Sequence, residues 1–333
     1  MRAPKFWNTD QGANVSANLL APFVPVYSAS DKICRAFISP KRVEVPIICV
    51  GNVTVGGGGK TPTALALARM MKDWGVTVHF LTRGYGGTAH GPLRVDAKQH
   101  NARKVGDEPI LLARYAPTWL ARKRPSGARL AIAAGAEAII MDDGFQNPSL
   151  VKDVSLMVVD AAFGFGNERR LPAGPLREPV TRGLARADAV VLIGTDEGGL
   201  AAQLSGSGVP LLRAELTPSL QALKLRDCDV VAFAGIARPA KFFTTLEAIG
   251  CNIIRRVAFA DHHRFTPNEI MTLVEQAGDQ GAIPVTTEKD WVRLPLEARA
   301  MVKSVPVTLE WENPDAVERL IRPALGDGTH AGG

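Results

Sequence analysis

The sequence is poor in cysteine and has no hydrophobic run long enough to cross a bilayer. Only four of its 333 residues are cysteine, and no two of them form a CxxC pair. They are too few and too scattered for a disulfide framework or a zinc ribbon, and this usage is typical of a reducing cytoplasm. No stretch approaches the ~18 continuous apolar residues that a transmembrane helix needs.

The charged residues are not gathered into one run either. The formal net charge is +6, and hydrophobic residues make up 46% of the chain, so we expect it to fold rather than remain disordered. A basic balance favours anionic partners. Because no basic run with interleaved aromatic residues is present, we expect no binding of nucleic acid. Phospholipid and a phosphorylated substrate remain as candidate partners.

Residues 1–40 form an N-terminal segment whose middle carries no charge. From Gln11 to Ser30 there is no charged side chain, and the segment lacks the compact apolar core and cleavage site of a signal peptide. It could lie on a membrane as an interfacial anchor, or it could be a helix that packs on the domain and is bent by two prolines. Basic residues flank it at Lys5, Lys32, Arg35, Lys41 and Arg42.

Short apolar runs alternate with helical patterns along most of the chain. Residues 45–50 form an apolar run, and residues 62–74 carry apolar side chains at helical spacing. Strands that alternate with helices indicate a parallel sheet covered on both faces. Further strands are predicted at 76–81, 138–141, 154–160, 189–194, 229–234, 252–257 and 283–286, and further helices at 239–249 and 267–277.

The alternation starts again near residue 229, which predicts two α/β domains. The first domain is predicted at 41–222 and a second, smaller one at 223–326, followed by a tail at 327–333. Between strands of the first domain, residues 164–179 are rich in Gly, Pro and Arg. A loop of that length in a compact domain is usually functional or disordered.

The strongest local motif is TVGGGGKT at residues 54–61, between the first predicted strand and its helix. Glycines let backbone N–H groups turn toward phosphate oxygens at the positive end of the following helix. Lys60 would reach the β- and γ-phosphates, and the Thr61 hydroxyl would ligate Mg²⁺. The strict pattern has Gly where Thr54 stands, so a chance glycine turn is the alternative. The motif predicts a P-loop NTPase-like domain that binds nucleotide through Thr54, Val55, Gly56, Gly57, Gly58, Gly59, Lys60 and Thr61.

Two adjacent aspartates, Asp142 and Asp143, close the predicted strand at 138–141. A carboxylate at the tip of such a strand can hold Mg²⁺ directly or through water. The structural alternative is a helix N-cap, for which aspartate is also favoured. The phosphate-binding motif upstream favours the metal role for both residues.

Two other polar motifs are ambiguous by themselves. Asp107, in VGDEP at 105–109, stands before a predicted helix and is most simply an N-cap. His262 and His263, in ADHH at 260–263, do not predict a metal site, because adjacent residues converge poorly and no further ligand cluster is nearby.

The order of the motifs is more specific than any one of them. GN at 51–52 and TVGGGGKTP at 54–62 are followed by TRGYGG at 82–87, VGDEP, DDGFQ at 142–146, LPAGPLREP at 171–179, ADHH and TEKD at 287–290. The chain resembles the tetraacyldisaccharide 4′-kinase family, the lipid A 4′-kinases of Gram-negative bacteria, over essentially its whole length. The threonine at position 54 is the family's own form of the loop.

The resemblance implies two α/β/α domains that face each other across a cleft. It also implies transfer of the γ-phosphate of ATP, with Mg²⁺, to the 4′-hydroxyl of tetraacyldisaccharide 1-phosphate, which gives lipid IVA. Asp107 matches the family's catalytic aspartate and His262 its supporting histidine, and with Lys60 they are the predicted catalytic residues. Asn147 stands where many members have histidine, which excludes an acid/base role for that position here.

The resemblance also favours the anchor interpretation of the N-terminal segment. A peripheral protein on the cytoplasmic face of the bacterial inner membrane would meet anionic lipid there. The residues alone leave two other classes open, namely a P-loop enzyme with a soluble substrate, such as a small-molecule kinase or ligase, and a nucleotide switch. The base-recognition motif NKxD of GTPases is absent, which weakens the last of these.

Overall fold

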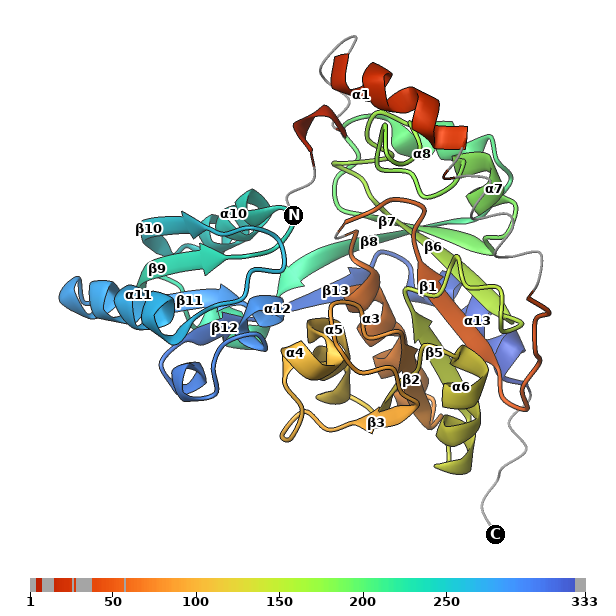
Figure 1. Cartoon of the computed structure of the whole chain (residues 1–333), viewed down its shortest axis with the longest axis horizontal. Coiled ribbons are helices and arrows are strands. Elements are labelled where there is room, and N and C mark those ends of the chain that lie inside the picture. The colour runs from red at the N-terminus through yellow and green to blue at the C-terminus, as the bar shows by residue number, and fades with distance from the viewer. Residues whose placement is uncertain (1–3, 8–14, 26, 28–37, 57, 327–333) are drawn as a thin grey trace.

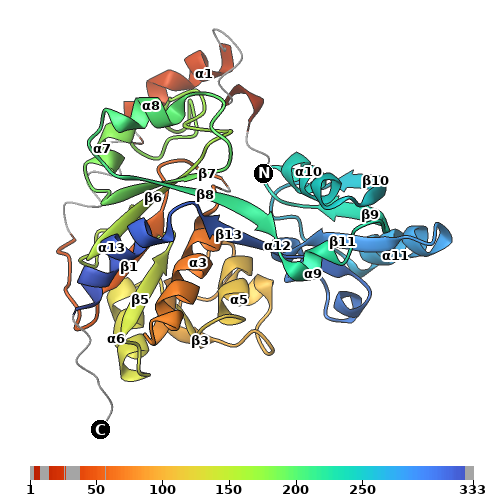
Figure 2. The ribbon, with the colours of Figure 1, turned by 180° about the vertical axis from the view of Figure 1, so that it is seen from behind.

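Two β-sheets organise the chain. The computed structural model describes residues 4–7, 15–25, 27, 38–56 and 58–326. Each sheet carries its own helices, and we call the two resulting units the larger and the smaller lobe; they lie side by side in Figure 1 and, from behind, in Figure 2. The larger sheet contains β1 (Ile47–Gly51), β2 (Val78–Thr82), β3 (Leu93–Val95), β4 (Thr118–Leu120), β5 (Ala138–Asp142), β6 (Val154–Asp160), β7 (Ala189–Ile193), β8 (Leu211–Pro218) and β13 (Val307–Trp311).

The strand order in the larger sheet is β13-β8-β7-β6-β1-β5-β2-β4-β3. β1 lies at its centre and pairs in parallel with β5 and β6, so that Ile48 is opposite both Ile140 and Val154. Both edge strands are antiparallel to their neighbours. The prediction of a parallel sheet is therefore right for the centre and wrong for the edges, because the edge strands enter from turns and from the smaller lobe rather than from helical crossovers.

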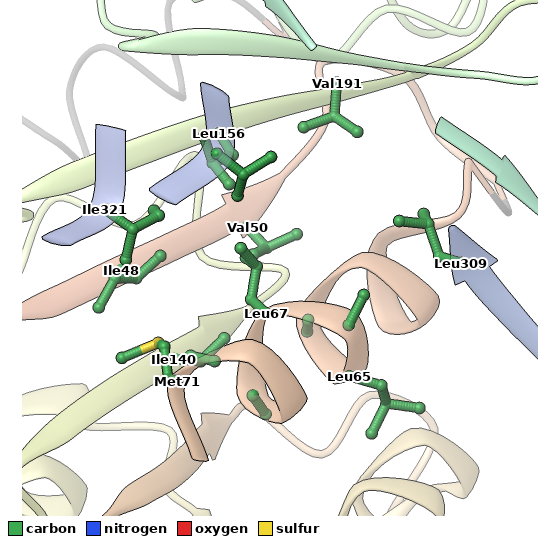
Figure 3. Packing of buried hydrophobic residues seen from close by; sticks show 14 of the residues in the cluster. Ile48, Val50, Leu65, Leu67, Met71, Ile140, Leu156, Val191, Leu309 and Ile321 are labelled. Atoms are coloured by element: carbon green, nitrogen blue, oxygen red, sulfur yellow. The ribbon is translucent and has the colours of Figure 1, made fainter. Parts of the chain in front are cut away.

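Helices cover both faces of the larger sheet, as the alternation of side chains along β1 requires. Ile48 and Val50 pack with one group of helices, whereas Ile47 and Cys49 pack with the other (Figure 3 shows the first cluster). Strands buried on both faces read as continuous apolar runs, which is why they were recognisable in the sequence. The first face carries α3 (Lys60–Asp73), α5 (Asp107–Ala113) and α13 (Pro314–Leu325), and the second carries α6 (Arg124–Ala133), α7 (Val180–Leu184) and α8 (Leu200–Ser205).

The smaller lobe repeats this α/β/α arrangement around a parallel sheet. Its strand order is β10-β9-β11-β12. The strands are β9 (Asp229–Ala234), β10 (Asn252–Ala258), β11 (Ile283–Thr287) and β12 (Lys303–Val305). On one face lie α9 (Leu220–Leu223) and α10 (Pro239–Ile249), and on the other α11 (Pro267–Asp279); the short helix α12 (Glu288–Trp291) follows β11.

The chain returns from the smaller lobe to the larger one before it ends. β13 pairs antiparallel with β8, with Leu309 opposite Leu216, and α13 buries Val317 and Ile321 in the core beside α3. The predicted second domain at 223–326 differs from this topology, because β13 and α13, which lie within that range, belong to the larger lobe. The pairing that brings them back is a tertiary contact that the local pattern does not contain.

The described part of the N-terminal segment packs against the loop at 164–179. The segment contains the turns Lys5–Trp7 and Ala21–Phe23 and the six-residue helix α1 (Val15–Leu20). Arg169 Nη1 donates to Asn18 Oδ1 at 2.6 Å, and Asn167 Nδ2 donates to the backbone oxygen of Phe6 at 2.9 Å. Across the described ranges, no helix has the length and apolar character needed to cross a membrane. The rest of residues 1–40 and the predicted tail at 327–333 lie outside the described residues.

Candidate active site

The phosphate-loop motif occupies the turn between β1 and α3. Lys60 begins the helix, is buried, and places Nζ 3.4 Å from both Asn52 Oδ1 and the backbone oxygen of Gly56. Gly59 has a φ of 86°, and a Cβ there would collide with Ile193. A left-handed backbone under that contact favours glycine. The predicted strand, loop and helix are confirmed, while Gly57 lies outside the described residues.

Thr61 and Asp142 meet beside this loop, as a metal site would require. The Thr61 hydroxyl donates to Asp142 Oδ2 at 3.3 Å, whereas the buried Oδ1 of Asp142 has no hydrogen-bond partner among the described residues. Burial raises the pKa of Asp142 to about 7, with help from the charges of Glu108 and Asp143. A hard cation would satisfy the unpartnered oxygen and offset the negative charges of Asp142, Asp143 and Glu108. These residues therefore fit Mg²⁺.

Only a few protein groups converge at this point. In the described part of the chain, no group of three or more His, Cys, Asp and Glu side chains could hold a metal ion by itself. Mg²⁺ keeps several waters and is usually bound by one or two carboxylates together with substrate phosphates. A site made of Thr61, Asp142 and nucleotide oxygens has this kind of coordination.

Asp143 plays a different part from its neighbour. Its φ is 52°, in the left-handed region, and its Oδ1 lies 3.7 Å from Lys60 Nζ and 3.3 Å from Arg177 Nη1. Burial opposes ionisation, but Lys60 and Arg177 outweigh it and lower the pKa to about 2. No helix follows β5 before β6, a stretch that the structure describes throughout. The N-cap alternative for both aspartates is therefore excluded.

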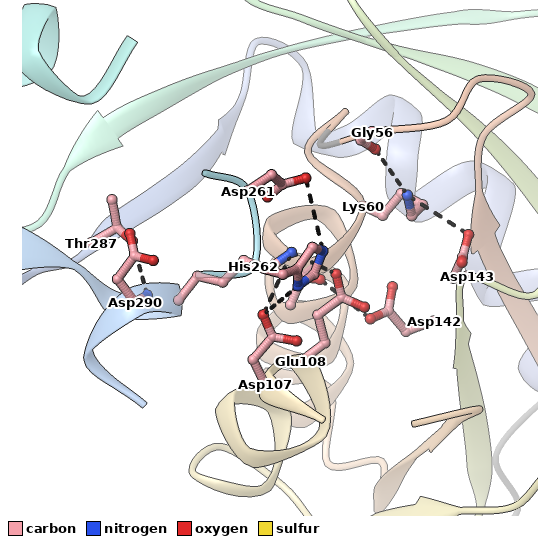
Figure 4. A network of polar contacts seen from close by, with 12 residues as sticks. Gly56, Lys60, Asp107, Glu108, Asp142, Asp143, Asp261, His262, Thr287 and Asp290 are labelled. Atoms are coloured by element: carbon pink, nitrogen blue, oxygen red, sulfur yellow. Dashed lines mark hydrogen bonds and ion pairs between the residues drawn. The ribbon is translucent and has the colours of Figure 1, made fainter. Parts of the chain in front are cut away.

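Asp107 and His262 come together from the two lobes. Asp107 is the first residue of α5 and the N-cap is Gly106, which makes no side-chain cap, so the N-cap interpretation of Asp107 is wrong. The Oδ2 atom of Asp107 lies 3.3 Å from Nδ1 of His262. Figure 4 draws the two side chains facing each other. His262 has a φ of 56°, an uncommon backbone for a residue other than glycine. The centroid of its ring lies 5.7 Å from the centroid of the Tyr85 ring, in an edge-on arrangement.

Sequence reasoning missed Arg293, which lies at the centre of this contact. Its guanidinium donates from Nε to Asp107 Oδ2 at 2.8 Å and again from Nη2 to the same oxygen. Nη2 is also 3.2 Å from His262 Nδ1. The residue follows the TEKD motif, which was noticed only as part of the family pattern. A single arginine after a short helix carries no signal of its own.

Lysine also faces the start of α5 from the smaller lobe. Lys289 Nζ lies 2.9 Å from Glu108 Oε1 and 3.9 Å from Asp107 Oδ2. Burial opposes ionisation of Asp107, but Lys289, His262 and Arg293 together hold its pKa well below the usual range. The carboxylate is therefore kept charged and in a fixed orientation.

The loop at 164–179 supports the phosphate loop directly. Val55 N donates to the backbone oxygen of Pro175 at 2.8 Å, and Arg177 N donates to that of Val53 at 2.7 Å. The Arg177 side chain reaches both Asp143 and Gln146 Oε1, each at 3.3 Å. The loop therefore contacts the phosphate loop and Asp143, which favours the functional alternative over the disordered one. Arg177 is a second residue that sequence reasoning left without a role.

Two other noted residues have structural contacts. Asn147 Oδ1 accepts hydrogen bonds from the backbone N and the hydroxyl of Ser149, at 3.0 and 2.7 Å, and so shapes the turn after Gln146. The His263 ring stacks on Phe259 at 4.6 Å, and its Nε2 lies 3.1 Å from Glu269 Oε1. His263 therefore points away from Asp107.

Comparisons with known proteins place the chain in one family over nearly its whole length. A family model described as "LpxK: Tetraacyldisaccharide-1-P 4'-kinase" matches residues 16–325. The tetraacyldisaccharide 4′-kinase of Rhodospirillum centenum is 49% identical to this chain, and the match covers 98% of this chain and 97% of that protein. The tetraacyldisaccharide 4′-kinase of Rhodospirillum rubrum is 50% identical, and the match covers 96% of this chain and 97% of that protein. The crystal structure of LpxK from Aquifex aeolicus in complex with ATP is 27% identical and has a TM-score of 0.71, with 93% of this chain and 99% of that one covered.

Proposed function

The chain belongs to the tetraacyldisaccharide-1-P 4′-kinase family, and on that premise we propose how its residues act. It is an ATP-dependent kinase that transfers the γ-phosphate of ATP to the 4′-hydroxyl of tetraacyldisaccharide 1-phosphate. The observation that carries this conclusion is a family match over residues 16–325 in a chain whose phosphate loop is intact. The roles of single residues are our proposal.

The phosphate loop and Lys60 hold the triphosphate of ATP. The loop at 54–61 presents backbone N–H groups ahead of α3, and the buried ammonium of Lys60 already faces three oxygen atoms, those of Asn52, Gly56 and Asp143. Phosphate oxygens would replace the two weak contacts to Asn52 and Gly56, each at 3.4 Å. Because charge on the transferring phosphoryl group is spread over its oxygens, a buried cation at that point stabilises the transition state.

Thr61 and Asp142 would hold Mg²⁺, with Asp143 beside them. The bound ion supplies positive charge to the phosphate oxygens of ATP. The unpartnered oxygen of Asp142 supports this assignment. Asp143, paired with Lys60 and Arg177, keeps those two cations oriented toward the phosphate loop.

Asp107 accepts the proton of the 4′-hydroxyl, and His262 keeps it in position. A carboxylate whose pKa lies well below the usual range is a weak base at neutral pH. That suits phosphoryl transfer, in which the transition state is loose and the hydroxyl proton leaves late. The contact between Asp107 and His262 supports a shared role, since it needs both lobes.

The N-terminal segment brings the enzyme to the cytoplasmic face of the membrane. Val15 and Leu19 are each 70% exposed and Phe23 is 58% exposed, which is unusual for large apolar side chains on one short segment. The segment contacts the loop at 164–179, and that loop contacts the phosphate loop. An apolar surface joined to the site through one loop suits an acceptor whose acyl chains stay partly in lipid. Lys41 and Arg42, both exposed, would meet anionic headgroups.

A transfer assay tests the proposal. Purified protein is incubated with [γ-³²P]ATP and tetraacyldisaccharide 1-phosphate, and the label is located on the lipid product. We expect transfer to the 4′-hydroxyl, strict dependence on the lipid acceptor, and none with Lys60→Ala. Hydrolysis of ATP without acceptor, or transfer only to a soluble sugar, would instead support one of the other P-loop classes.

A further inference from the structure

We propose that Arg293 is a positioning residue for phosphoryl transfer, which orients the Asp107 carboxylate and the His262 ring across the junction of the two lobes. The inference rests on the proposed function, because it takes Asp107 and His262 to act on the acceptor. Nothing in the sequence motifs assigns Arg293 a role.

Arg293 is anchored firmly in the smaller lobe. Its Nη1 donates to the backbone oxygen of Gly235 and to Asp290 Oδ1, each at 2.8 Å. Asp290 is itself fully buried, and its Oδ2 accepts from Gly235 N at 3.0 Å and from the Thr287 hydroxyl at 2.8 Å. The Arg293 side chain is only 6% exposed. Because these two hydrogen bonds fix one edge of the guanidinium, the group has little freedom to rotate.

The opposite edge of the guanidinium fixes Asp107. Nε and Nη2 both donate to Oδ2 of that carboxylate, and Nη2 also lies beside Nδ1 of His262. Two contacts from Arg293 and one from His262 therefore fall on a single carboxylate oxygen, and the Lys289 ammonium lies 3.9 Å from the same atom. They set the plane of the carboxylate and with it the direction of the other oxygen, Oδ1. Planar paired donors of this kind are specific to arginine, since the lysine ammonium is a point charge.

A purely mechanical role is the competing explanation, because any ion pair between the lobes could hold them together. The chain provides a matched control for it. Arg238, at the start of α10 in the smaller lobe, donates to both carboxylate oxygens of Asp160, at 3.1 and 2.5 Å, and Asp160 ends β6 in the larger lobe. This second bridge joins the lobes without touching Asp107 or His262.

The test compares Arg293→Ala, Arg293→Lys and Arg238→Ala for kcat and for the KM of ATP and of the lipid acceptor. We expect Arg293→Ala to lower kcat by about 10²-fold, the order of loss that misplacement of a reacting group produces, with the KM of ATP nearly unchanged. Arg293→Lys keeps the charge but not the paired hydrogen bonds, so it should recover only a small part of kcat. Arg238→Ala should stay within about threefold of the parent.

Double variants separate positioning from stability. If Arg293 acts through Asp107, then Asp107→Ala/Arg293→Ala should be no slower than Asp107→Ala. Near-normal kcat in Arg293→Ala, additive losses in the double variant, or equal losses in Arg238→Ala would each overturn the inference. Thermal unfolding shows whether the variants fold. If Arg293→Ala does not fold, the test is made with Arg293→Lys.

These outcomes also distinguish this inference from the proposed function. If Asp107→Ala itself keeps normal activity, the proposed role of Asp107 fails and the inference fails with it. If Asp107→Ala is inactive while Arg293→Ala is fully active, only the role of Arg293 is lost.

Discussion

Asp107 and His262 meet at 3.3 Å, although one begins a helix of the larger lobe and the other follows a strand of the smaller lobe. The contact exists only because the lobes lie against each other at this point. It gives the two residues a common environment with Arg293 and Lys289. The site is therefore assembled by the arrangement of the lobes, and variants of its parts should behave as a unit.

Lys60→Ala and Thr61→Ala should abolish transfer and leave the fold intact. Losing one charged or polar phosphate contact typically costs 10²–10³ in rate. Steady-state kinetics together with circular dichroism checks this. A Lys60→Ala variant with near-normal kcat would show that the loop is not the catalytic phosphate site.

Asp142→Asn should raise the Mg²⁺ concentration needed for half-maximal activity, and Asp143→Asn should do so as well. Removing the negative ligand Asp142, or the negative charge of Asp143 beside it, weakens binding of a hard cation more than it weakens the contacts of the nucleotide. Asp160→Asn is the matched control, because Asp160 also ends a strand of the same sheet but is paired with Arg238 and Lys241. The idea fails if Mg²⁺ titrations give the same midpoint for the parent and for both Asp142→Asn and Asp143→Asn.

The bridge between Asp160 and Arg238 should make stability depend on pH in acid. Burial opposes ionisation of Asp160, but its hydrogen bonds to Arg238 and the nearby Lys241 outweigh burial and lower the pKa. A lowered pKa contributes stability above the unfolded value of ~3.9, and this contribution is lost as the pH falls through the folded value. Asp160→Asn should therefore cost about 1–3 kcal/mol at pH 7. The difference in thermal midpoint from the parent should begin to shrink only below about pH 3.9 and should vanish once the pH is below the lowered folded pKa of Asp160, whereas a constant difference would contradict the assignment.

Leu19→Ser combined with Phe23→Ser should weaken binding to vesicles that contain anionic lipid. Moving one large apolar side chain from water into lipid contributes ~1.5–3 kcal/mol, so binding should fall by at least 10-fold. Leu220→Ser is the control, because Leu220 is 84% exposed on the smaller lobe. Unchanged co-sedimentation of the double variant, at unchanged thermal stability, would favour a segment that only packs on the protein.

Much of the fold could be read from the sequence where the signal is local. The strands β6 and β9 and the helix α10 have the predicted bounds, since each apolar or amphipathic run is closed by a polar residue or a glycine. β3 and β12 have only three residues, and β13 lies at the edge of the larger sheet. Their existence depends on partners far away in the sequence, which no local pattern contains.

The same distinction holds for the site. The phosphate loop is contiguous, so its glycines, Lys60 and Thr61 were evident from the residues. Asp107 and His262 had only ambiguous local patterns, and their roles came from the family resemblance. Arg293 was indicated neither by a local pattern nor by the family resemblance. Its importance arises from hydrogen bonds to two groups in the smaller lobe and to one carboxylate in the larger lobe.

The most direct test of the account is a double-mutant cycle on Asp107 and His262, with kcat and thermal stability measured for both single variants and for the pair. Asp107→Ala should lower kcat by roughly 10²–10⁴, the span of a general base, with little change in ATP affinity. Since the two residues act as a unit, Asp107→Ala/His262→Ala should be scarcely slower than Asp107→Ala alone. Additive rate losses, or a loss of stability without a loss of rate, would contradict the account.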